Sequence, residues 1–346
     1  MTTVQNIIVR MPNWLGDLVM ATPVLADIRA RWPEANITAM CQAGVAPLLA
    51  QDPHIDELYA FHKPSGWLHR QPRRNIIKAL RDGQYDLGIL LTNSLSSAWW
   101  FWRGQVKRRV GFAAQMRSPL LSDAVPFPAN KETQHLVITY KKLLKGLGVP
   151  LSDHPPHLYL SEQEKENTAK FLRKYGITDK HILVGVNPGA AYGSAKCWLP
   201  TRFRQVTQRL LENPLVRVVY FGDNSGAPLV REICTGLSDR VVNLAGKTSI
   251  RELMSLIQAC NVMLTNDSGP MHMAAALGTP PVALFGSTND VATGPYNHGR
   301  VIHKHVPCSP CYKRECPIDF KCMTAIEVEE VVDELQRLIR DVKLPI

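Results

Sequence analysis

The chain has 346 residues, of which 45% are hydrophobic and 20% charged, and its formal net charge is +10. This composition is ordinary for a soluble globular protein, and the length is sufficient for two domains. No stretch approaches the roughly 18 apolar residues of a membrane span, and the apolar run near the N-terminus is too short for the core of a signal peptide. We therefore expect a cytoplasmic protein.

The first half of the chain alternates short apolar strands with helical stretches. Strands are predicted over 6–10, 37–41, 86–91 and 108–112. This alternation predicts a parallel sheet with helices on both faces. A polar, proline-bearing stretch over 149–167 then predicts a linker into a second unit.

The second half repeats the pattern and ends in an amphipathic helix. Strands are predicted over 181–186, 216–222, 261–265 and 282–286, and helices begin near Thr201 and Ser249. A final helix is predicted over 324–341, with a capping box formed by Thr324 and Glu327 at its start.

These elements predict the domain organisation. We expect an α/β protein of two doubly wound, Rossmann-like parallel-sheet domains that face one another across a cleft. The first domain spans 1–155 and the second 156–322, and the C-terminal amphipathic helix spans 323–346.

Basic residues are concentrated in the first half of the chain. Residues 1–160 carry 18 Lys and Arg against 11 acids, a balance of +7, and the excess gathers over 62–74, 106–109 and 140–145. Together with Trp67, such clusters suit a nucleic acid, an anionic membrane surface or a phosphorylated substrate. A solvated basic face is the alternative interpretation.

Four of the eight cysteines crowd into one late segment: Cys308, Cys311, Cys316 and Cys322. The first pair has the spacing of zinc ligands, but the second pair is separated by five residues rather than two, so the match to a zinc site is partial. The segment either binds a structural metal or forms a loop that is held by disulfides or is simply compact, and both interpretations stay open.

Two familiar nucleotide-binding motifs do not occur in the sequence. After the first strand, MPNWLGD offers one glycine where a dinucleotide-binding motif needs three, and no GxxxxGK(S/T) phosphate loop is present. Hydride transfer and nucleotide hydrolysis by those designs therefore lose their main support.

Asp17 follows Gly16 at the predicted start of the first helix, directly after a strand. An acid at this position stabilises a helix N-terminus, and a carboxylate at a strand end in a cleft is also a common general base. Both interpretations are open from the residues alone.

Lys196 lies in the loop NPGAAYGSAKCWLP, between a predicted strand and a predicted helix. Gly189 and Gly193 permit close backbone approach, and a lysine ammonium neutralises a phosphate as a compact point charge. Trp198 and Pro200 indicate that the loop is packed. Phosphate binding by Lys196 and a simply solvated Lys196 are therefore equally supported interpretations.

The stretch NDSGPMHMAAALGTPPVALFG (266–286) places a polar turn between a strand and a helix. The backbone N–H groups of Ser268 and Gly269 form a site for an anion at the helix start. Asp267 would repel a phosphate but accepts hydrogen bonds from sugar hydroxyls. His272 either donates to the same ligand or is a satisfied core histidine. The combination predicts a ligand that is both a sugar and a diphosphate.

Four motifs, in this order, carry a family resemblance. They are PNWLGD followed by LVMATPVL, NPGAAYGSAKCWLP, NDSGPMHMAAALGTPPVALFGSTN, and CSPCYKRECPIDFKCM. Over nearly the whole chain, the sequence resembles the ADP-heptose:lipopolysaccharide heptosyltransferases of glycosyltransferase family 9, and it favours their type II members. The resemblance implies an inverting glycosyltransferase of the GT-B fold, which agrees with the predicted layout.

The resemblance also implies roles for individual residues. Asp17 matches the proposed general base, which takes the proton from the acceptor hydroxyl, and Lys196 matches the lysine that contacts the departing diphosphate. Asp267 matches the acid that binds the donor heptose. Ala191 and Tyr192 stand where type I members carry threonines, which favours type II. The predicted substrate-binding set is completed by Gly16, Gly189, Tyr192, Ser194, Asp223, Ser268, Gly269, Pro270 and His272.

The implied donor is ADP-L-glycero-D-manno-heptose, bound by the second domain. The implied acceptor is the phosphorylated Kdo-lipid A core with one heptose, bound by the basic first domain in peripheral contact with the inner leaflet, at the cytoplasmic face of the inner membrane. Because no DXD-type acid pair is present, we expect no metal ligand in the site and no essential cofactor, although a divalent cation is compatible with it. We expect no nucleic acid as a partner.

Two alternative functions stay open. One is a related heptosyltransferase, type I or later-acting, with a different acceptor, because the fold does not separate these activities. The other is a non-catalytic polyanion binder that uses the basic half of the chain.

Overall fold

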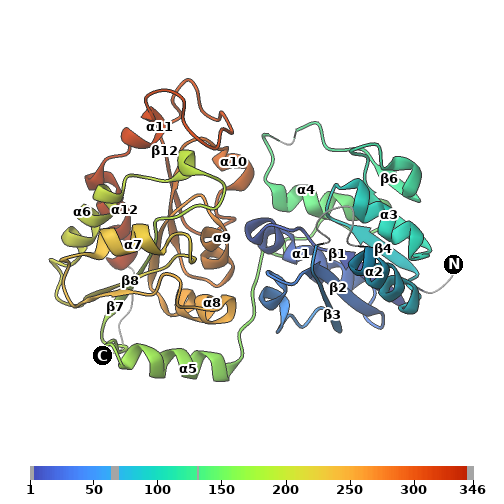
Figure 1. Ribbon diagram of the computed structural model, residues 1–346, viewed down its shortest axis with the longest axis horizontal. Helices are drawn as coiled ribbons and strands as arrows, with labels where there is room; N and C mark the ends of the chain where they lie inside the picture. The colour runs from blue at the N-terminus through green and yellow to red at the C-terminus, as the bar shows by residue number, and fades with distance from the viewer. Residues whose placement is uncertain (1–3, 64–69, 131, 341–346) are drawn as a thin grey trace. The chain divides into compact units, whose positions relative to one another are not determined.

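Two compact units make up the chain, residues Met1–Tyr159 and Leu160–Ile346. They are seen in the computed structural model, which describes residues 4–63, 70–130 and 132–340 (Figure 1). Trp67 and the last six residues of the predicted C-terminal helix segment lie outside the described residues. No helix in the described ranges is both long enough and apolar enough to span a bilayer.

The first unit is built on a parallel sheet. Its strands are β1 (Asn6–Arg10), β2 (Asn36–Gln42), β3 (Glu57–Phe61), β4 (Leu87–Leu90), β5 (Arg108–Phe112) and β6 (Asp123–Val125). They lie in the order β3-β2-β1-β4-β5-β6. The helices of this unit are α1 (Leu15–Arg31), α2 (Arg70–Asp82), α3 (Leu95–Arg103) and α4 (Leu136–Lys142).

The second unit also contains a parallel sheet. Its strands are β7 (Ile182–Asn187), β8 (Val216–Tyr220), β9 (Val241–Asn243), β10 (Val262–Asn266), β11 (Pro281–Phe285) and β12 (Arg300–His303), in the order β12-β11-β10-β7-β8-β9. Its helices are α5 (Glu162–Arg173), α6 (Pro200–Leu210), α7 (Ala227–Cys234), α8 (Ile250–Ala259), α9 (Gly269–Ala276), α10 (Asp290–Thr293), α11 (Lys321–Thr324) and α12 (Val328–Arg340).

Both sheets have the same topology, because the first strand of each lies between its second and fourth strands. The chain therefore reverses its direction of winding between β1 and β4, and again between β7 and β10. Ligands of such folds bind outside the carboxyl ends of the strands at this switch point. Asp17 follows β1 and Asp267 follows β10, so two predicted site residues lie at the two switch points. The predicted fold class is confirmed.

Apolar residues buried on both faces of the sheets form the core of each unit. Ile7, Ile8 and Val9 of β1 are fully buried, as expected for a central parallel strand. In the second unit, the predicted apolar stripe of the last helix is buried in the core, where α12 packs on α6 and β10. The fully or largely buried residues of this stripe are Val328, Val331, Val332 and Leu335.

The predicted linker over 149–167 is wrong in its last part, because α5 begins at Glu162. Ser161 and Glu164 form a capping box at its N-terminus. Among the α5 residues, Thr168 and Leu172 are buried, and the rest of the helix surface is mostly polar. Because so few apolar residues mark the helix, its sequence resembles that of a linker.

The predicted capping box of Thr324 and Glu327 is also wrong. The short helix α11 ends at Thr324, whose hydroxyl donates back to the Phe320 carbonyl at 3.4 Å, and α12 begins only at Val328. The apolar period continues across this break, which is why the sequence predicts one helix.

Candidate active site

Two asparagines end the central strands of the second unit. Asn187 closes β7 and Asn266 closes β10, and both are buried. The Asn266 amide donates to the Pro188 carbonyl at 2.7 Å and accepts from the Trp198 N–H at 3.0 Å. Because one buried amide satisfies backbone groups before and after Lys196, it fixes both ends of the loop that carries this lysine.

Lys196 and Asp267 form an ion pair that is nearly buried. The Lys196 Nζ lies 2.5 Å from Asp267 Oδ2, and the two side chains are 15% and 5% exposed. The Thr288 hydroxyl donates to the same carboxylate oxygen at 2.6 Å. The three residues follow β7, β10 and β11, which are neighbours in the sheet. The structure thus brings together the cation predicted for the diphosphate and the acid predicted for the sugar.

The loop that carries Lys196 is held by the segment after β12. The Tyr192 hydroxyl donates to the Tyr312 carbonyl at 2.7 Å. A Cβ at Gly193 would lie 2.3 Å from the Arg314 carbonyl, so only glycine permits this approach. The Lys196 ammonium and the Arg314 guanidinium lie 4.9 and 5.4 Å from the centre of the Tyr192 ring. Two cations therefore share one aromatic ring beside Asp267.

The N-terminus of α9 has no side-chain cap. Ser268 occupies the N-cap position, but its hydroxyl accepts from the Asn187 amide at 3.3 Å instead of from the helix backbone. The helix then begins with Gly269 and Pro270, and His272 is buried one turn further on. Backbone N–H groups without a side-chain cap, together with the helix dipole, favour an anion at this position.

Three other predicted residues lie on loops of the second unit. Gly189 faces open space, since a Cβ there would meet no atom within 4 Å. Ser194 begins the short 3-10 turn Ser194–Lys196. Asp223 is exposed beyond β8, and its Oδ1 accepts from the Ser225 hydroxyl and the Gly226 N–H, both at 2.8 Å. Their contact with a substrate stays a prediction.

In the first unit, Asp17 lies beside Gly16 in the first turn of α1. The Tyr140 hydroxyl, from α4, donates to Asp17 Oδ1 at 3.3 Å. Burial raises the pKa of Tyr140 well above its ordinary value of 10.0, and the charge of Asp17 raises this pKa further. The phenol therefore stays protonated and donates to the carboxylate. A half-buried acid with such a donor, at the carboxyl end of β1, fits a general base.

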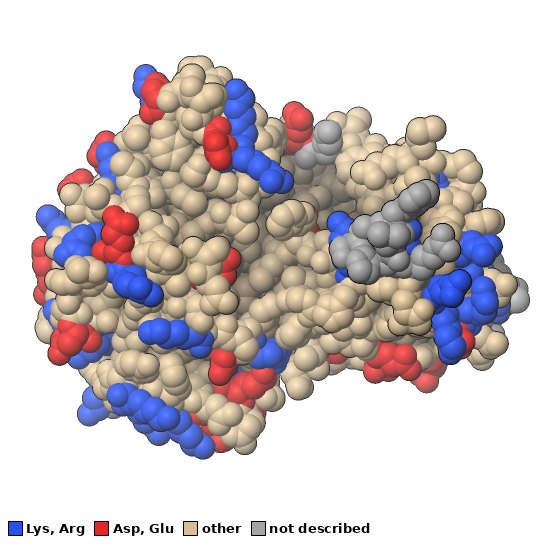
Figure 2. All heavy atoms as spheres, viewed as in Figure 1, with Lys and Arg blue, Asp and Glu red and all other residues tan. Residues whose placement is uncertain are grey.

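Three basic residues from the predicted clusters make contacts within the first unit. Lys107 pairs with Asp86 and Arg108 with Asp123, each at 2.8 Å. Lys141 is buried and donates to backbone carbonyls at 2.8 and 2.7 Å. On the visible face of the molecule, acidic groups stand beside basic ones rather than forming one continuous basic surface (Figure 2). Lys141 therefore serves the fold, whereas Lys107 and Arg108 are exposed residues with an acidic partner.

All eight cysteines are free thiols. Cys308 is exposed and Cys322 is buried, and burial together with the neighbouring thiols of the segment raises the pKa of Cys322. Across the described ranges, no three of the four late thiols come within ligand distance of one another. The structure therefore favours a compact loop without a disulfide over a stapled one.

Several residues near the site were not predicted from the sequence. The position of Thr288, in a polar turn directly after a predicted strand, could have indicated a site residue. Arg314 comes from a distant segment, and no local pattern indicates it. A carboxylate and two histidines also converge, with their ligand atoms within 4.8 Å of one another: Asp290, His303 and His305.

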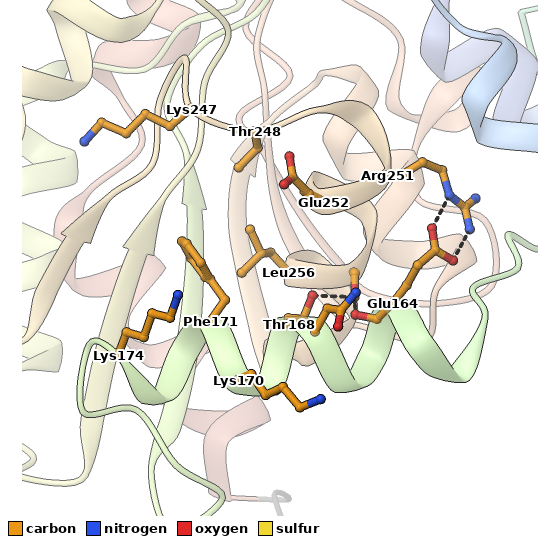
Figure 3. A pocket seen from close by; sticks show the side chains of 12 residues that line it. Glu164, Thr168, Lys170, Phe171, Lys174, Lys247, Thr248, Arg251, Glu252 and Leu256 are labelled. Atoms are coloured by element: carbon orange, nitrogen blue, oxygen red, sulfur yellow. Dashed lines mark hydrogen bonds and ion pairs between the residues drawn. The ribbon is translucent and has the colours of Figure 1, made fainter.

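A separate pocket lies between α5 and α8 (Figure 3). Among its lining residues are Lys170, Phe171 and Lys247. At the edge of this pocket, the Glu164 carboxylate accepts hydrogen bonds from Arg251 Nε at 2.7 Å and from Arg251 Nη2 at 2.6 Å. None of the predicted site residues lines this pocket, so we do not assign it to the substrate.

Comparisons with known proteins agree with this geometry. Residues 73–321 match the family described as glycosyltransferase family 9 (heptosyltransferase). The chain is 33% identical over 310 residues to lipopolysaccharide heptosyltransferase 2 of Salmonella typhimurium, covering 86% of this chain and 87% of that protein. The solved structure of the E. coli ADP-heptose lipopolysaccharide heptosyltransferase II superposes with a TM-score of 0.82 and 29% identity, covering 97% and 99% of the two chains. A glycosyltransferase family 9 structure from Veillonella parvula gives a TM-score of 0.86 and 25% identity, covering 99% of each chain.

The two doubly wound units match the GT-B fold of the solved heptosyltransferase II, and the match extends over both units. The chain belongs to glycosyltransferase family 9, the heptosyltransferases. It is therefore an enzyme that transfers a glycosyl group.

Proposed function

We propose that the chain transfers heptose from ADP-L-glycero-D-manno-heptose to the first heptose of the lipopolysaccharide inner core, with inversion of the anomeric centre. The observation that carries the proposal is the group of Lys196, Asp267 and Thr288 beside the N-terminus of α9. It combines a cation and uncapped N–H groups, which suit a diphosphate, with a carboxylate, which suits sugar hydroxyls. The similarity to lipopolysaccharide heptosyltransferase 2 supports the same donor and acceptor.

In this proposal the second unit binds the donor. Lys196 and the N–H groups of Ser268 and Gly269 contact the diphosphate, and Asp267 accepts from the heptose hydroxyls. When the bond between the anomeric carbon and the phosphate oxygen breaks, negative charge grows on the departing ADP. Groups that contact this oxygen stabilise the transition state more than the ground state. The ion pair with Asp267 keeps the Lys196 ammonium in a defined position.

Other predicted residues complete the proposed donor site. Pro270 has no N–H and contributes shape, while Gly189 leaves open space for a ligand. Tyr192 supports the ammonium of Lys196. Asp223 lies beyond β8 and has the carboxylate needed to accept from ribose hydroxyls.

Asp17 is the proposed general base. Its carboxylate takes the proton of the acceptor hydroxyl while the hydroxyl oxygen bonds to the anomeric carbon, on the face opposite to the departing ADP. Displacement from the opposite face inverts the anomeric centre. Tyr140 holds the carboxylate through its hydrogen bond. No step of this scheme requires a metal ion or another cofactor, and a divalent cation at the diphosphate is compatible with it.

We place the acceptor, the phosphorylated Kdo-lipid A core with one heptose, in the first unit. Because this acceptor is a lipid, the enzyme would work in peripheral contact with the inner leaflet, at the cytoplasmic face of the inner membrane. A type I or later-acting enzyme would use the same donor with a shorter or longer core, so the acceptor decides between these activities.

The test measures ADP release from ADP-heptose with the purified monoheptosylated core, for the intact protein and for Asp17→Asn. We expect acceptor-dependent release by the intact protein and a loss of about 100-fold or more in the variant. Release only with the heptose-free core, or only with a longer core, would assign the type I or the later-acting activity. No release with any of the three, despite measurable ADP binding, would overturn the proposed reaction and leave the nucleotide site.

A further inference from the structure

Three potential metal ligands converge beyond β11 and β12, in the second unit. Asp290 begins α10, His303 ends β12, and His305 follows two residues later. The Asp290 Oδ1 lies 2.9 Å from His303 Nδ1, and Oδ2 lies 3.7 Å from His305 Nε2. The His303 side chain is only 2% exposed, whereas that of His305 is 65% exposed. The group is therefore anchored in the unit and open to solvent on one side.

The hydrogen bonds of His303 determine which of its nitrogens carries the proton. The Ser309 hydroxyl has a single proton, and it donates this proton to the Gly286 carbonyl. The same hydroxyl oxygen lies 2.9 Å from His303 Nε2, so it must accept from an Nε2–H. The other ring nitrogen, Nδ1, lies 2.9 Å from the Asp290 carboxylate, where either a proton on Nδ1 or a metal ion bridges the two groups.

We propose that Asp290, His303 and His305 form a binding site for a divalent transition metal, with Zn²⁺ as the first choice. Two imidazoles and one carboxylate are ligands that zinc prefers. Ligands at about 2.1 Å around a tetrahedral ion stand about 3.4 Å apart. The nearest carboxylate oxygen lies 2.9 Å from His303 Nδ1, and the other oxygen lies 3.7 Å from His305 Nε2. Water reaches the fourth position on the exposed side of His305.

Two further features suit this assignment. Metal-binding histidines usually donate their second ring N–H to a fixed oxygen, and Ser309 supplies that oxygen to His303. His305 adopts a left-handed backbone conformation, with φ at 44°, and its ring centre lies 4.0 Å from that of His303. The two rings therefore lie side by side and present ring nitrogens to the same carboxylate.

The site would fasten two segments that shape the candidate donor site. One is the turn from Gly286 to Asp290, which carries Thr288. The other is the segment after β12, where Tyr312 donates through its N–H to the Ser287 carbonyl at 2.7 Å. A metal bound by Asp290 from the first segment and His305 from the second would hold them together. The proposal does not depend on which sugar or acceptor the enzyme uses.

The experiment compares metal binding by the chelator-treated full chain and its variants. Zn²⁺ is titrated by calorimetry, and Co²⁺ by visible absorption, which separates thiolate ligands from nitrogen and oxygen ligands. We expect one site per chain, without the intense sulfur-to-cobalt charge-transfer bands. Ser309→Ala should weaken binding about 10-fold to 100-fold, and His305→Ala and Asp290→Asn at least as much.

Exposed residues provide the controls. His305 is exposed, so His305→Ala is the variant that retains the fold, which circular dichroism checks. His298→Gln removes an exposed histidine outside the group and should leave Zn²⁺ affinity unchanged. No binding by the intact chain, equal affinity in His305→Ala, or charge-transfer bands that disappear in Cys308→Ser/Cys311→Ser would each overturn the proposal. The last result would assign the metal to the late cysteines.

Discussion

Lys196 and Asp267 neutralise one another, with the ammonium 2.5 Å from the carboxylate and both side chains largely buried. The residues are 71 positions apart in the sequence. Their pairing means that neither side chain acts alone. Removal of the lysine leaves a buried carboxylate without its counter-charge, and removal of the carboxylate frees the lysine to interact more strongly with an anion.

The first prediction concerns Lys196→Ala. We expect turnover to fall by about 100-fold, because the charge on departing ADP loses its cation. Unfolding free energy should fall by about 3 kcal/mol, because Asp267 stays buried and unpaired. Adding Asp267→Asn should restore stability but not turnover. Chemical denaturation and initial-rate measurements check both effects, and Lys247→Ala, at an exposed lysine, is the control. Unchanged turnover in Lys196→Ala would remove this lysine from the diphosphate site.

The second prediction separates the sugar from the nucleotide. Asp267→Asn should weaken binding of ADP-heptose by about 10-fold or more, because hydrogen bonds from sugar hydroxyls to a carboxylate are lost. Binding of free ADP should stay the same or become tighter, because Lys196 is released from its partner. Calorimetric titration of the two ligands measures the difference. An equal loss for ADP and ADP-heptose would contradict the assignment of Asp267 to the sugar.

The central strands were predictable, and some outer strands were not. Apolar runs such as IIV (7–9) and ILVGV (182–186) occur because a parallel strand in the middle of a sheet is buried on both faces. Three of the four outermost strands, β3, β6 and β12, carry exposed residues and lack such runs, and β6 has only three residues. Their pairing depends on neighbours far away in the sequence, so local pattern does not reveal them.

In the candidate site, too, some residues were predictable from the sequence and others were not. Acids that follow a strand at the start of a helix, such as Asp17 in the first turn of α1 and Asp267 just before α9, are recognisable because parallel strands place their carboxyl ends at one edge. The ion pair with Lys196, the hydroxyl of Thr288 and the guanidinium of Arg314 come together only through strand order and loop packing. A single sequence gives residue types and local spacing, and neither quantity contains these long-range contacts.

The third prediction concerns Tyr140→Phe. The phenol donates to Asp17, and its raised pKa keeps it protonated throughout the neutral and mildly alkaline range. Its loss should lower kcat by about 10-fold, because the carboxylate is positioned less well for proton transfer. The KM for ADP-heptose should not change, because Tyr140 belongs to the proposed acceptor unit. Steady-state kinetics at saturating acceptor separate the two parameters. A raised KM for the donor with unchanged kcat would contradict a positioning role.

Glu164 and Arg251 make the pH dependence of the second unit testable. The hydrogen bonds from Arg251, followed by those from Ser161, lower the pKa of Glu164 from 4.5 to about 2 against the opposing effect of burial. A carboxyl group whose pKa is lower in the folded state contributes stability above its unfolded pKa. This contribution is lost as the pH falls from about 4.5 towards about 2.

The fourth prediction is that Arg251→Gln flattens this dependence. At pH 7 the variant should be less stable by about 2 kcal/mol, because a hydrogen-bonded carboxylate loses its charged donor. The difference between the two proteins should shrink steadily below pH 4.5, since protonation of Glu164 removes the same interaction from the intact chain. Urea denaturation at a series of pH values measures this difference in unfolding free energy. Lys170→Gln, at an exposed lysine 4.0 Å from Glu166, should change stability by less than about 0.5 kcal/mol. A constant difference at all pH values would mean that Arg251 stabilises the helix pair by packing rather than by charge.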